Sequence, residues 1–380
     1  MSPKAPDGTI DGMDAEDSKD AVASAGGAGS PGRGKPNLLD LNFHQLEGLL
    51  VGLGEPAFRA RQVWQWLWQK AVTTPLDMTN LSKDLRARLD QASAIRWPSV
   101  SRRLESSDGT VKFLLKLADD AEIETVLIPE KDHYTQCLSS QAGCAMACTF
   151  CRTGQMGLTR NLTHGEILGQ ILVARHYLAT LVSPLKLRNL VFMGMGEPLL
   201  NYDNLLHALE SLHHPQGLDF SSRRVTVSTV GIVPGILEFG RAGLGSLAVS
   251  LHAPDQELRE KIMPKAARAL PLPRLMEVLR QIPLKARETI TFEYVLLGGV
   301  NDSPEQARDL VRLLSHVKGK VNLIAFNESP GLPYQAPSPE RVEAFQNILR
   351  DKGITVTLRK SKGRDIFAAC GQLLVAHEME

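Results

Sequence analysis

The sequence predicts an α/β protein in which a partial (β/α) barrel follows a small N-terminal helical domain and a β-hairpin region. First, apolar β-rich runs alternate with helical stretches beyond residue 160, which is typical of parallel strands with helices outside. Second, residues 37–100 instead repeat apolar residues three or four positions apart. With 380 residues, of which 43% are hydrophobic, the chain is long enough for one large domain plus a smaller one.

The N-terminal part of the chain divides into a tail and a helical domain. Residues 1–36 are rich in Gly, Ala, Ser, Pro and Asp, with almost no large apolar side chains, which predicts disorder. Residues 37–100 contain the patterns "LLDLNFHQLEGLL", "RQVWQWLW" and "LSKDLRARL", which predict a helical accessory domain. Trp64 and Trp68 share one helical face and are expected in its core, whereas Trp66 lies on another face.

Residues 101–130 predict a β-hairpin region that leads into the barrel. The runs "SRRLESSDGTVKFLLKL" and "AEIETVLIPE" are β-rich, and Asp108-Gly109 is a turn signal. Residues 131–374 predict the barrel. Its strands are expected at 188–194, 223–229, 246–252, 289–297, 320–327 and 355–360, and its helices at 163–182, 202–213, 233–242, in stretches up to 282, and from 303 and 338.

Composition favours a cytoplasmic protein without a membrane partner. The longest apolar runs, such as residues 167–174, fall well short of a bilayer span, and the N-terminus lacks a signal-peptide pattern. Because cytoplasmic thiols stay reduced, the five cysteines are interpreted as metal ligands or reactive groups. The net charge of +1 does not decide whether nucleic acid is bound. The candidate phosphate contacts are local cations: Arg223, Arg224, Lys261, Lys265, Arg268, Arg359, Lys360, Lys362 and Arg364.

Three cysteines lie within eight residues, in "CAMACTFC". A structural zinc site takes four ligands, usually as two separated pairs, whereas Cys144, Cys148 and Cys151 form one compact run. An iron–sulfur cluster normally takes four thiolates, so one held by these three would leave an iron open to a small molecule. The alternative is that Cys137 completes a zinc or electron-transfer site.

Polar residues and glycines gather where the predicted parallel strands end. Ligands of such barrels bind at the carboxyl ends of the strands. Glycine there lets the backbone approach a ligand closely. Taken singly, each polar strand-end residue is more often a turn or cap. These residues are Gly196, Glu197, Ser228, Ser250, His252 and Asn327, together with Leu251, which lies between Ser250 and His252.

The C-x3-C-x2-C spacing resembles the radical S-adenosylmethionine (SAM) superfamily, as do Phe150 before the third cysteine and "MGMGEP" at residues 193–198. Two longer stretches, "QCLSSQAGCAMACTFC" and "KGRDIFAACGQL", resemble the bacterial RlmN and Cfr family of adenine RNA methyltransferases. The likeness runs from Asn37 to Leu374. It implies that residues 131–374 are a radical SAM core with a partial (β/α) barrel.

The resemblance implies two cofactors, a [4Fe-4S] cluster and SAM, with two SAM molecules used per turnover. Cys144, Cys148 and Cys151 would hold the cluster. Gly196 and Glu197 would bind the SAM amino group. The remaining SAM contacts would be Ser228, Ser250, Leu251, His252 and Asn327.

The resemblance also implies roles for the other two cysteines. One SAM methylates Cys370, and a 5'-deoxyadenosyl radical from the second SAM converts this methyl group into a methylene radical that adds to adenine. Cys137 then releases the product and forms a disulfide with Cys370. Glu124 would accept a proton. Without the resemblance, the cysteines are interpreted as small buried apolar residues, and Glu124 as equally a solvent-facing strand residue.

The implied activity is methylation of carbon 2 of adenosine in large-subunit (23S) ribosomal RNA and in the tRNA anticodon loop, on a base extruded from its stack. One alternative is the Cfr-like enzyme that modifies carbon 8. Another is a noncatalytic RNA-binding protein with a structural metal. The resemblance further implies an electron donor such as flavodoxin or its reductase. The protein is expected to be monomeric.

Overall fold

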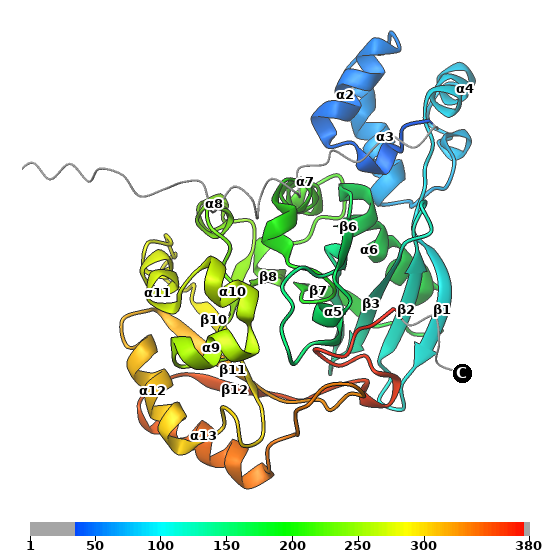
Figure 1. Ribbon diagram of the computed structural model, residues 1–380. Helices are drawn as coiled ribbons and strands as arrows, with labels where there is room; N and C mark the ends of the chain where they lie inside the picture. Colours follow the sequence, from blue (N-terminus) through cyan, green and yellow to red (C-terminus); the bar gives the residue numbers. More distant parts are fainter. Residues whose placement is uncertain (1–34, 376–380) are drawn as a thin grey trace, which may run out of the picture. The chain divides into compact units, whose positions relative to one another are not determined.

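Helices come first in the described chain, as the apolar spacing predicts. The computed structural model describes residues 35–375, so the predicted disorder of residues 1–34 lies outside the described residues. The carbonyl of Pro36 accepts a hydrogen bond from the Ala94 amide (2.9 Å), which ties the start of the described chain to the end of the helical region. The helices here are η1 (Leu38–Asp40), α2 (Phe43–Gly52), α3 (Arg59–Trp68), η2 (Pro75–Asp77) and α4 (Lys83–Ala92) (Figure 1).

The tryptophans of α3 hold this helical region together. Trp64 and Trp68 are fully buried, as predicted, and Phe43 of α2 packs edge-on against Trp64 with ring centroids 5.5 Å apart. Trp66 points elsewhere, and its indole nitrogen donates to Asn80 Oδ1 (2.5 Å). Each of these large rings buries apolar area that stabilises so small a core.

One ten-stranded sheet forms the centre of the protein. Its order is β1-β2-β3-β4-β7-β8-β9-β10-β11-β12, antiparallel from β1 to β4 and parallel from β4 to β12. The strands are β1 (Ser99–Glu105), β2 (Val111–Lys116), β3 (Glu122–Pro129), β4 (His133–Cys137), β7 (Lys186–Phe192), β8 (Val225–Thr229), β9 (Ser246–Ser250), β10 (Ile290–Leu296), β11 (Gly319–Ala325) and β12 (Val356–Arg359). No pairing joins β12 to β1 in residues 35–375, so the predicted partial barrel is confirmed.

The β-rich residues before the barrel belong to the same sheet as the parallel strands. β3 pairs with β4, which pairs in parallel with β7. The sequence did not predict β4, nor the small hairpin of β5 (Gln141–Gly143) and β6 (Leu158–Asn161). These strands are short and carry polar residues, so they lack the long apolar runs by which the other strands were predicted.

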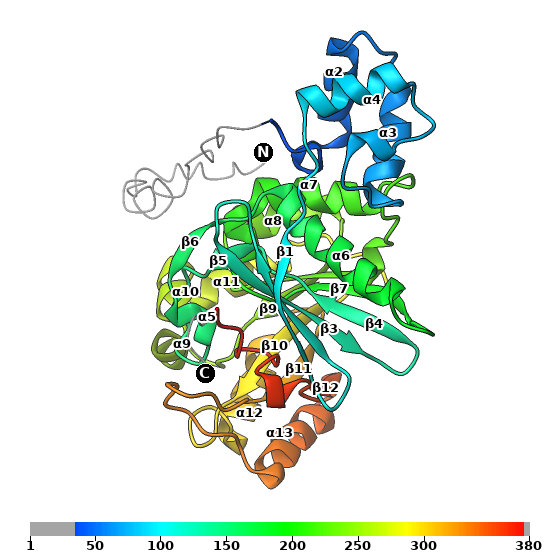
Figure 2. The same cartoon turned by 90° about the vertical axis from the view of Figure 1, so that its right-hand side faces the viewer.

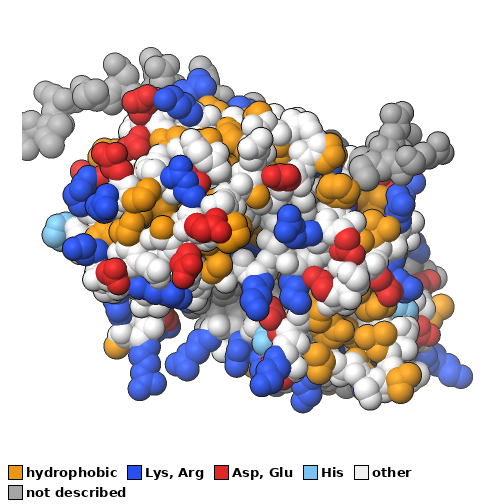
Figure 3. All heavy atoms as spheres, turned by 90° about the horizontal axis from the view of Figure 1, so that it is seen from below, with side chains coloured by type: hydrophobic (Ala, Val, Ile, Leu, Met, Phe, Trp, Pro, Cys, Tyr) orange, Lys and Arg blue, Asp and Glu red, His pale blue; other side chains and the backbone are white. Residues whose placement is uncertain are grey.

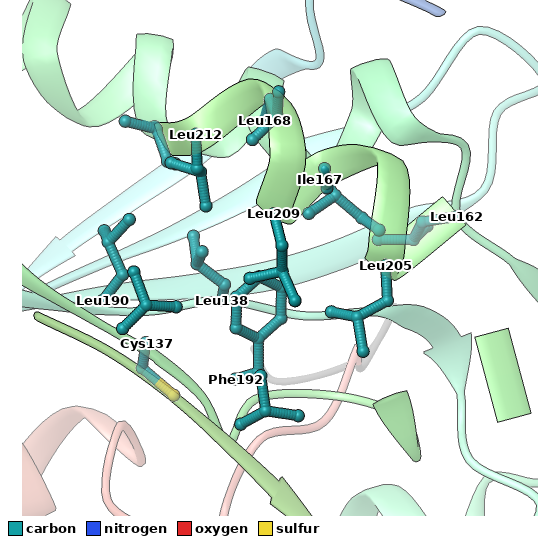
Figure 4. Close-up of a cluster of buried hydrophobic side chains, with 14 of the residues drawn as sticks. Cys137, Leu138, Leu162, Ile167, Leu168, Leu190, Phe192, Leu205, Leu209 and Leu212 are labelled. Atoms are coloured by element: carbon teal, nitrogen blue, oxygen red, sulfur yellow. The ribbon is translucent and has the colours of Figure 1, made fainter. Parts of the chain in front are cut away.

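Helices follow the parallel strands and cover one face of the sheet (Figures 1 and 2). They are α5 (Arg152–Gln155), α6 (His164–Ala179), η3 (Pro198–Asn201), α7 (Tyr202–His213), η4 (Ser222–Arg224), α8 (Gly235–Ala242), α9 (Gln256–Ile262), α10 (Pro264–Ala269), α11 (Leu272–Arg280), α12 (Pro304–Leu314), α13 (Pro339–Asp351) and η5 (Arg364–Ile366). Leucines of α6 and α7 pack in a buried cluster with Leu190 and Phe192 of β7 and with Leu138, which follows β4 (Figure 4). In the described part of the chain, no helix combines the length and apolarity needed to cross a bilayer.

Candidate active site

The three-cysteine loop runs from the end of β5 to α5, at the carboxyl edge of the sheet. Its backbone is fixed at several points: the Cys144 amide donates to the Gly157 carbonyl (2.8 Å) and the Cys151 amide to the Cys148 carbonyl (3.1 Å). The Thr149 amide donates to the carbonyl of Ile262 at the end of α9 (3.0 Å). Ala147 adopts a positive φ of 52°, which lets the loop turn tightly.

The thiols of this loop are close enough to influence one another. Burial, opposed in part by a backbone hydrogen bond, raises the pKa of Cys144 to about 12. Burial also raises the pKa of Cys148, and the charges of Cys151 and Cys144 add to the effect. In residues 35–375 no three or more His, Cys, Asp or Glu side chains are arranged to hold a single metal ion. A cubane binds each thiolate to a different iron, so three thiols on one loop fit a cluster.

Cys137 does not join this loop. It ends β4, and Figure 4 shows its sulfur turned away from Leu212 at the edge of the leucine cluster. Burial raises the pKa of Cys137 to about 12, and the thiol of Cys370 is the next largest cause. The loop cysteines are not among its charge partners. The structure thus brings Cys137 to Cys370 and does not support the alternative that Cys137 completes a four-cysteine site.

Cys370 lies half-buried on the wall of a cavity of about 730 Å³ inside the curved sheet. Its carbonyl accepts a hydrogen bond from Asn327 Nδ2 (3.3 Å). Arg359 lines the same cavity, and charge interaction with Cys370, then with Cys137, raises the pKa of this guanidinium. All five cysteines are free thiols, so the disulfide between Cys137 and Cys370 is not present in this structure.

Gly196 and Glu197 lie in the loop that follows β7, and Glu197 directly precedes η3. Gly196 has φ +104°, and an added Cβ would lie 2.6 Å from the Gln141 Cβ, so only glycine fits there. Glu197 is buried, and its two carboxylate oxygens accept from the amides of Leu199 (3.1 Å) and Val230 (2.9 Å). Burial raises the pKa of Glu197 to about 7. The carboxylate thus connects the segments that follow β7 and β8, and in its ionised form it can bind a positively charged group.

The next strands contribute Ser228, Ser250, Leu251 and His252. The hydroxyls of Ser228 and Ser250 lie 3.4 Å apart, and Leu251 is fully buried. His252 has φ +56°, and its Nδ1 accepts a hydrogen bond from the Val295 amide (3.0 Å). Burial lowers the pKa of His252 to about 3, so the ring is neutral. Its other neighbour is the ring of Phe150, at 4.9 Å between centroids, so His252 lies beside the cysteine loop.

Glu124 does not line the cavity of Cys370, but it is hydrogen-bonded to the segment that carries Cys370. It lines a second cavity of about 200 Å³, and its Oε1 forms an ion pair with Lys112 Nζ (2.8 Å). Its Oε2 accepts a hydrogen bond from the Leu374 amide (3.0 Å). Burial raises the pKa of Glu124, which the Lys112 charge opposes. The solvent-facing alternative is therefore wrong, because Glu124 is only 3% exposed.

The segment 365–374 lies between the two cavities. Residues 368–370 line the larger cavity, whereas residues 365–367, 372 and 374 line the smaller one. The Gly371 carbonyl accepts a hydrogen bond from the Arg152 amide (2.9 Å), just after the third loop cysteine. This bond places Cys370 next to the three-cysteine loop.

Cations outnumber carboxylates around the larger cavity. Its lining contains Arg223, Arg224, Lys320, Arg359, Lys360 and Lys362, against Glu130 and Glu293. Seen from below, Lys and Arg side chains gather around a hollow in the surface (Figure 3). The other cations predicted to contact phosphate, Lys261, Lys265, Arg268 and Arg364, are not part of this lining. Lys261 instead pairs with Glu257 on α9 (2.7 Å).

Three residues near the site were missed or given another role from the sequence. Lys112 was not selected, and Arg359 was selected only as a phosphate contact. Arg259, a fully buried arginine of α9, was not selected either. The one signal for Lys112 is a charged residue within an otherwise apolar run, which is too common to select a site, and Arg259 lies among the charged residues of "QELREKI", where nothing in the sequence marks it as buried.

Comparisons with known proteins agree with this geometry. Residues 36–95 match the family model described as "Ribosomal RNA large subunit methyltransferase N-terminal domain", and residues 138–314 match the radical SAM superfamily. A dual-specificity RNA methyltransferase RlmN from Solidesulfovibrio magneticus is 65% identical over 337 residues, covering 89% of this chain and 96% of the relative. The chain belongs to the RlmN family. The resemblance read from the cysteine motifs is thereby confirmed.

A second RlmN relative and a solved structure are also similar to this chain over most of its length. The RlmN of Nitratidesulfovibrio vulgaris (strain DP4) is 57% identical over 345 residues, covering 89% of this chain and 94% of the relative. A crystal structure of a radical SAM methyltransferase from Sphaerobacter thermophilus superposes with a TM-score of 0.84 at 42% identity, covering 89% of this chain and 99% of that one. The chain is therefore an RNA methyltransferase of the radical SAM type. Its family implies a [4Fe-4S] cluster and SAM as cofactors.

Proposed function

We propose that this protein methylates carbon 2 of adenosine in 23S ribosomal RNA and in the tRNA anticodon loop. One observation carries the proposal. A half-buried thiol, Cys370, lines a cation-rich cavity, beside a second buried thiol, Cys137, and next to the three-cysteine loop. A carbon donor, a resolving group and a place for an RNA base therefore lie together.

The proposed cofactor contacts are the three loop cysteines and residues at or just after the ends of the parallel strands. Cys144, Cys148 and Cys151 hold the cluster, which with SAM supplies the one-electron chemistry that an sp2 carbon requires. Glu197 binds the amino group of SAM through its carboxylate, since burial has already removed competing water. The remaining contacts come from Gly196, Ser228, Ser250, Leu251, His252 and Asn327. Two SAM molecules are used per turnover, one of them to methylate Cys370.

The chain's own residues complete the reaction. Cys370 carries the methyl carbon to the base. The Cys137 sulfur, as a thiolate, then attacks the Cys370 sulfur and breaks its bond to the methylene carbon, which keeps the electron pair and takes a proton to become the methyl group of the product. An external thiol reductant must then reduce the Cys137–Cys370 disulfide. Glu124 accepts the proton that leaves the adenine ring. Lys112 and the Leu374 amide each bind one carboxylate oxygen, and each oxygen keeps a second lone pair on which Glu124 can take the proton.

RNA reaches Cys370 through the cation-lined cavity. Arg223, Arg224, Lys360 and Lys362 neutralise phosphates, and the target adenosine is extruded from its stack toward the thiol. The helical region 37–100 is an RNA-binding accessory domain that precedes the core of residues 131–374. The enzyme acts as a monomer in the cytoplasm, where a donor such as flavodoxin or its reductase supplies electrons.

Nucleoside analysis tests the proposal. Anaerobically reconstituted protein is incubated with SAM, a low-potential reductant and unmodified 23S RNA fragment or tRNA, and the digested RNA is examined by mass spectrometry. We expect 2-methyladenosine from both RNAs and none with Cys370→Ala. A product of 8-methyladenosine would assign the Cfr-like activity instead. Cluster binding without 5'-deoxyadenosine would assign a noncatalytic RNA-binding protein.

A further inference from the structure

Arg259 is a buried cation that has no carboxylate partner among residues 35–375. It lies on α9 with 0% of its surface exposed. One terminal nitrogen donates to the Leu270 carbonyl (3.0 Å) and the other to the Val230 carbonyl (2.8 Å). Its Nε is buried without any hydrogen-bond partner. Two carbonyl dipoles do not cancel a full charge, and burying an unpaired charge is strongly unfavourable.

The cysteine loop packs directly on the helix that carries Arg259. Both the amide and the hydroxyl of Thr149 donate to the carbonyl of Ile262, at 3.0 and 3.2 Å, and Ile262 lies about one helical turn after Arg259. Cys148 and Ile262 also share one buried apolar cluster. Arg259 and Ile262 are three residues apart and so share one face of α9, the helix on whose end the cysteine loop packs.

The charges around Arg259 are few. Burial lowers the pKa of Arg259 to about 10, so it stays charged at neutral pH. The other group that its charge reaches is His252, which is neutral at that pH because burial lowers its pKa to about 3. The thiol of Cys148 belongs to the loop that packs on α9, in one buried cluster with Leu258 and Ile262 of this helix. Because no ion pair in residues 35–375 involves Arg259, a negatively charged cluster on the cysteine loop, which packs on α9, would give this guanidinium a counter-charge.

We propose that Arg259 is the buried counter-charge of the iron–sulfur cluster and raises its reduction potential. This inference rests on the proposed roles of Cys144, Cys148 and Cys151 as ligands. A cluster bound by three thiolates is negative, and one-electron reduction makes it more negative without taking up a proton. A nearby cation in a low-dielectric site therefore stabilises the reduced state more than the oxidised state. The electron comes from a low-potential one-electron donor, which is dithionite in the test below.

A purely structural role makes a different prediction. The hydrogen bond to the Val230 carbonyl steadies the loop whose Val230 amide binds Glu197, so Arg259 could act only as a brace. A brace depends on hydrogen bonds, whereas a counter-charge depends on charge. Substitutions that separate these two properties distinguish the roles.

The test is a potentiometric titration of the reconstituted full chain without SAM, followed by electron paramagnetic resonance of the reduced cluster. Arg259→Met and Arg259→Gln remove the charge, and Gln keeps a donor for one carbonyl. For both, we expect the reduced-to-oxidised ratio at a fixed potential to fall about tenfold, which is about 59 mV for a one-electron couple. Arg259→Lys keeps the charge and should stay within about twofold of the parent, although its melting temperature falls.

Two controls accompany these variants. Arg175→Met removes a partly buried arginine of α6 that donates to the Trp68 carbonyl (3.0 Å) in the N-terminal helical region, and it should leave the potential unchanged. Cys148→Ala should lose the cluster. A full cluster in Cys148→Ala would refute the ligand assignment itself, and with it the basis of the proposed function.

The remaining outcomes decide the role of Arg259 alone. Full iron content and the parental potential in Arg259→Met and Arg259→Gln would overturn the inference and leave the proposed function standing. If only Arg259→Lys binds iron, the charge is needed to hold the cluster, which supports the inference. If none of the three variants binds iron, the hydrogen bonds are what matter, and Arg259 is a brace.

Discussion

Lys112 Nζ lies 2.8 Å from Glu124 Oε1, and both side chains are buried, with 8% and 4% of their surface exposed. The same ammonium group donates to the Phe367 carbonyl (3.2 Å), while the other carboxylate oxygen accepts from the Leu374 amide (3.0 Å). This ion pair thus ties β2 and β3 to both ends of the segment that carries Cys370. The position of Cys370 and the availability of Glu124 as a base are coupled through it.

Lys112→Met is expected to destabilise the protein by about 3–5 kcal/mol, because it leaves the Glu124 carboxylate buried without its partner. The loss should be smaller in the double variant Lys112→Met/Glu124→Gln, in which no buried charge remains. Chemical denaturation monitored by circular dichroism measures both. Lys116→Met is the matched control on the same strand: it removes an ion pair of equal length, to Asp120, at an exposed position. An equal loss of stability in the control would show that burial of the Lys112 pair is unimportant.

Variants at Cys370 and at Cys137 are expected to stop the reaction at different stages. Cys370→Ala lacks the carbon carrier, so it should give neither methylated RNA nor a protein–RNA adduct. Cys137→Ala should still form the bond to adenine but cannot release it, so protein cross-linked to RNA through Cys370 should accumulate. A denaturing gel with and without nuclease shows the adduct. Identical behaviour of the two variants, with no adduct in either, would refute this division of labour.

Each loop cysteine is expected to be essential for the cluster. Cys144→Ala, Cys148→Ala and Cys151→Ala should each lose most bound iron and all reductive cleavage of SAM, because two thiolates hold a cubane poorly. Iron analysis and chromatographic detection of 5'-deoxyadenosine measure this. Cys137→Ala, which changes a cysteine outside the loop, should keep its iron. Retained iron and retained SAM cleavage in all three loop variants would refute the assignment of these cysteines as cluster ligands.

SAM binding is expected to weaken as the pH falls below about 7. Burial raises the pKa of Glu197 to about 7, so the carboxylate is ionised above this pH and protonated below it. Only the ionised form attracts the SAM ammonium, so the affinity should fall by up to about tenfold for each pH unit below pH 7. Isothermal titration of reconstituted protein with SAM measures this. Glu197→Gln should bind weakly at every pH; an unchanged pH profile in this variant would exclude Glu197 as the titrating group.

Acid is expected to destabilise the protein through His164. Burial, with a smaller effect of the nearby His207, lowers the pKa of His164 from 6.5 to about 4. A lowered histidine pKa means that stability is full above pH 6.5 and is lost as the pH falls toward 4. Lowering the pH to about 5 should lower the free energy of unfolding by about 2 kcal/mol.

His164→Phe is expected to flatten this pH dependence. Both ring nitrogens of His164 are buried without partners, so the apolar ring should keep or raise the stability at neutral pH. His44→Gln, at a side chain that is 94% exposed, should keep the parental pH dependence. Thermal unfolding at several pH values measures all three proteins. The same acid sensitivity in His164→Phe would show that another group is responsible.

Much of the fold could be predicted because its signals are local. Helix α6 begins where Thr163 and Glu166 form a capping box, and helix α12 begins at the equivalent pair Ser303 and Gln306. The alternation of apolar strands and helices identified the parallel part of the sheet. Strand β4 was not predicted because its sequence is short and polar. It forms a strand because it pairs with β3 and β7, and its own residues do not reveal that pairing.

The sequence by itself determined the family and the three-cysteine loop, since the ligands of that loop lie within eight residues and need only their own spacing. Only the tertiary structure decided which distant residues meet. The β2–β3 register places Lys112 opposite Val126 and Glu124 opposite Leu114, so the two charges are diagonal neighbours. The meeting of Cys137 with Cys370 depends likewise on where β4 and the segment after β12 lie in the sheet. Such contacts arise from strand order and packing, which no short stretch of sequence encodes.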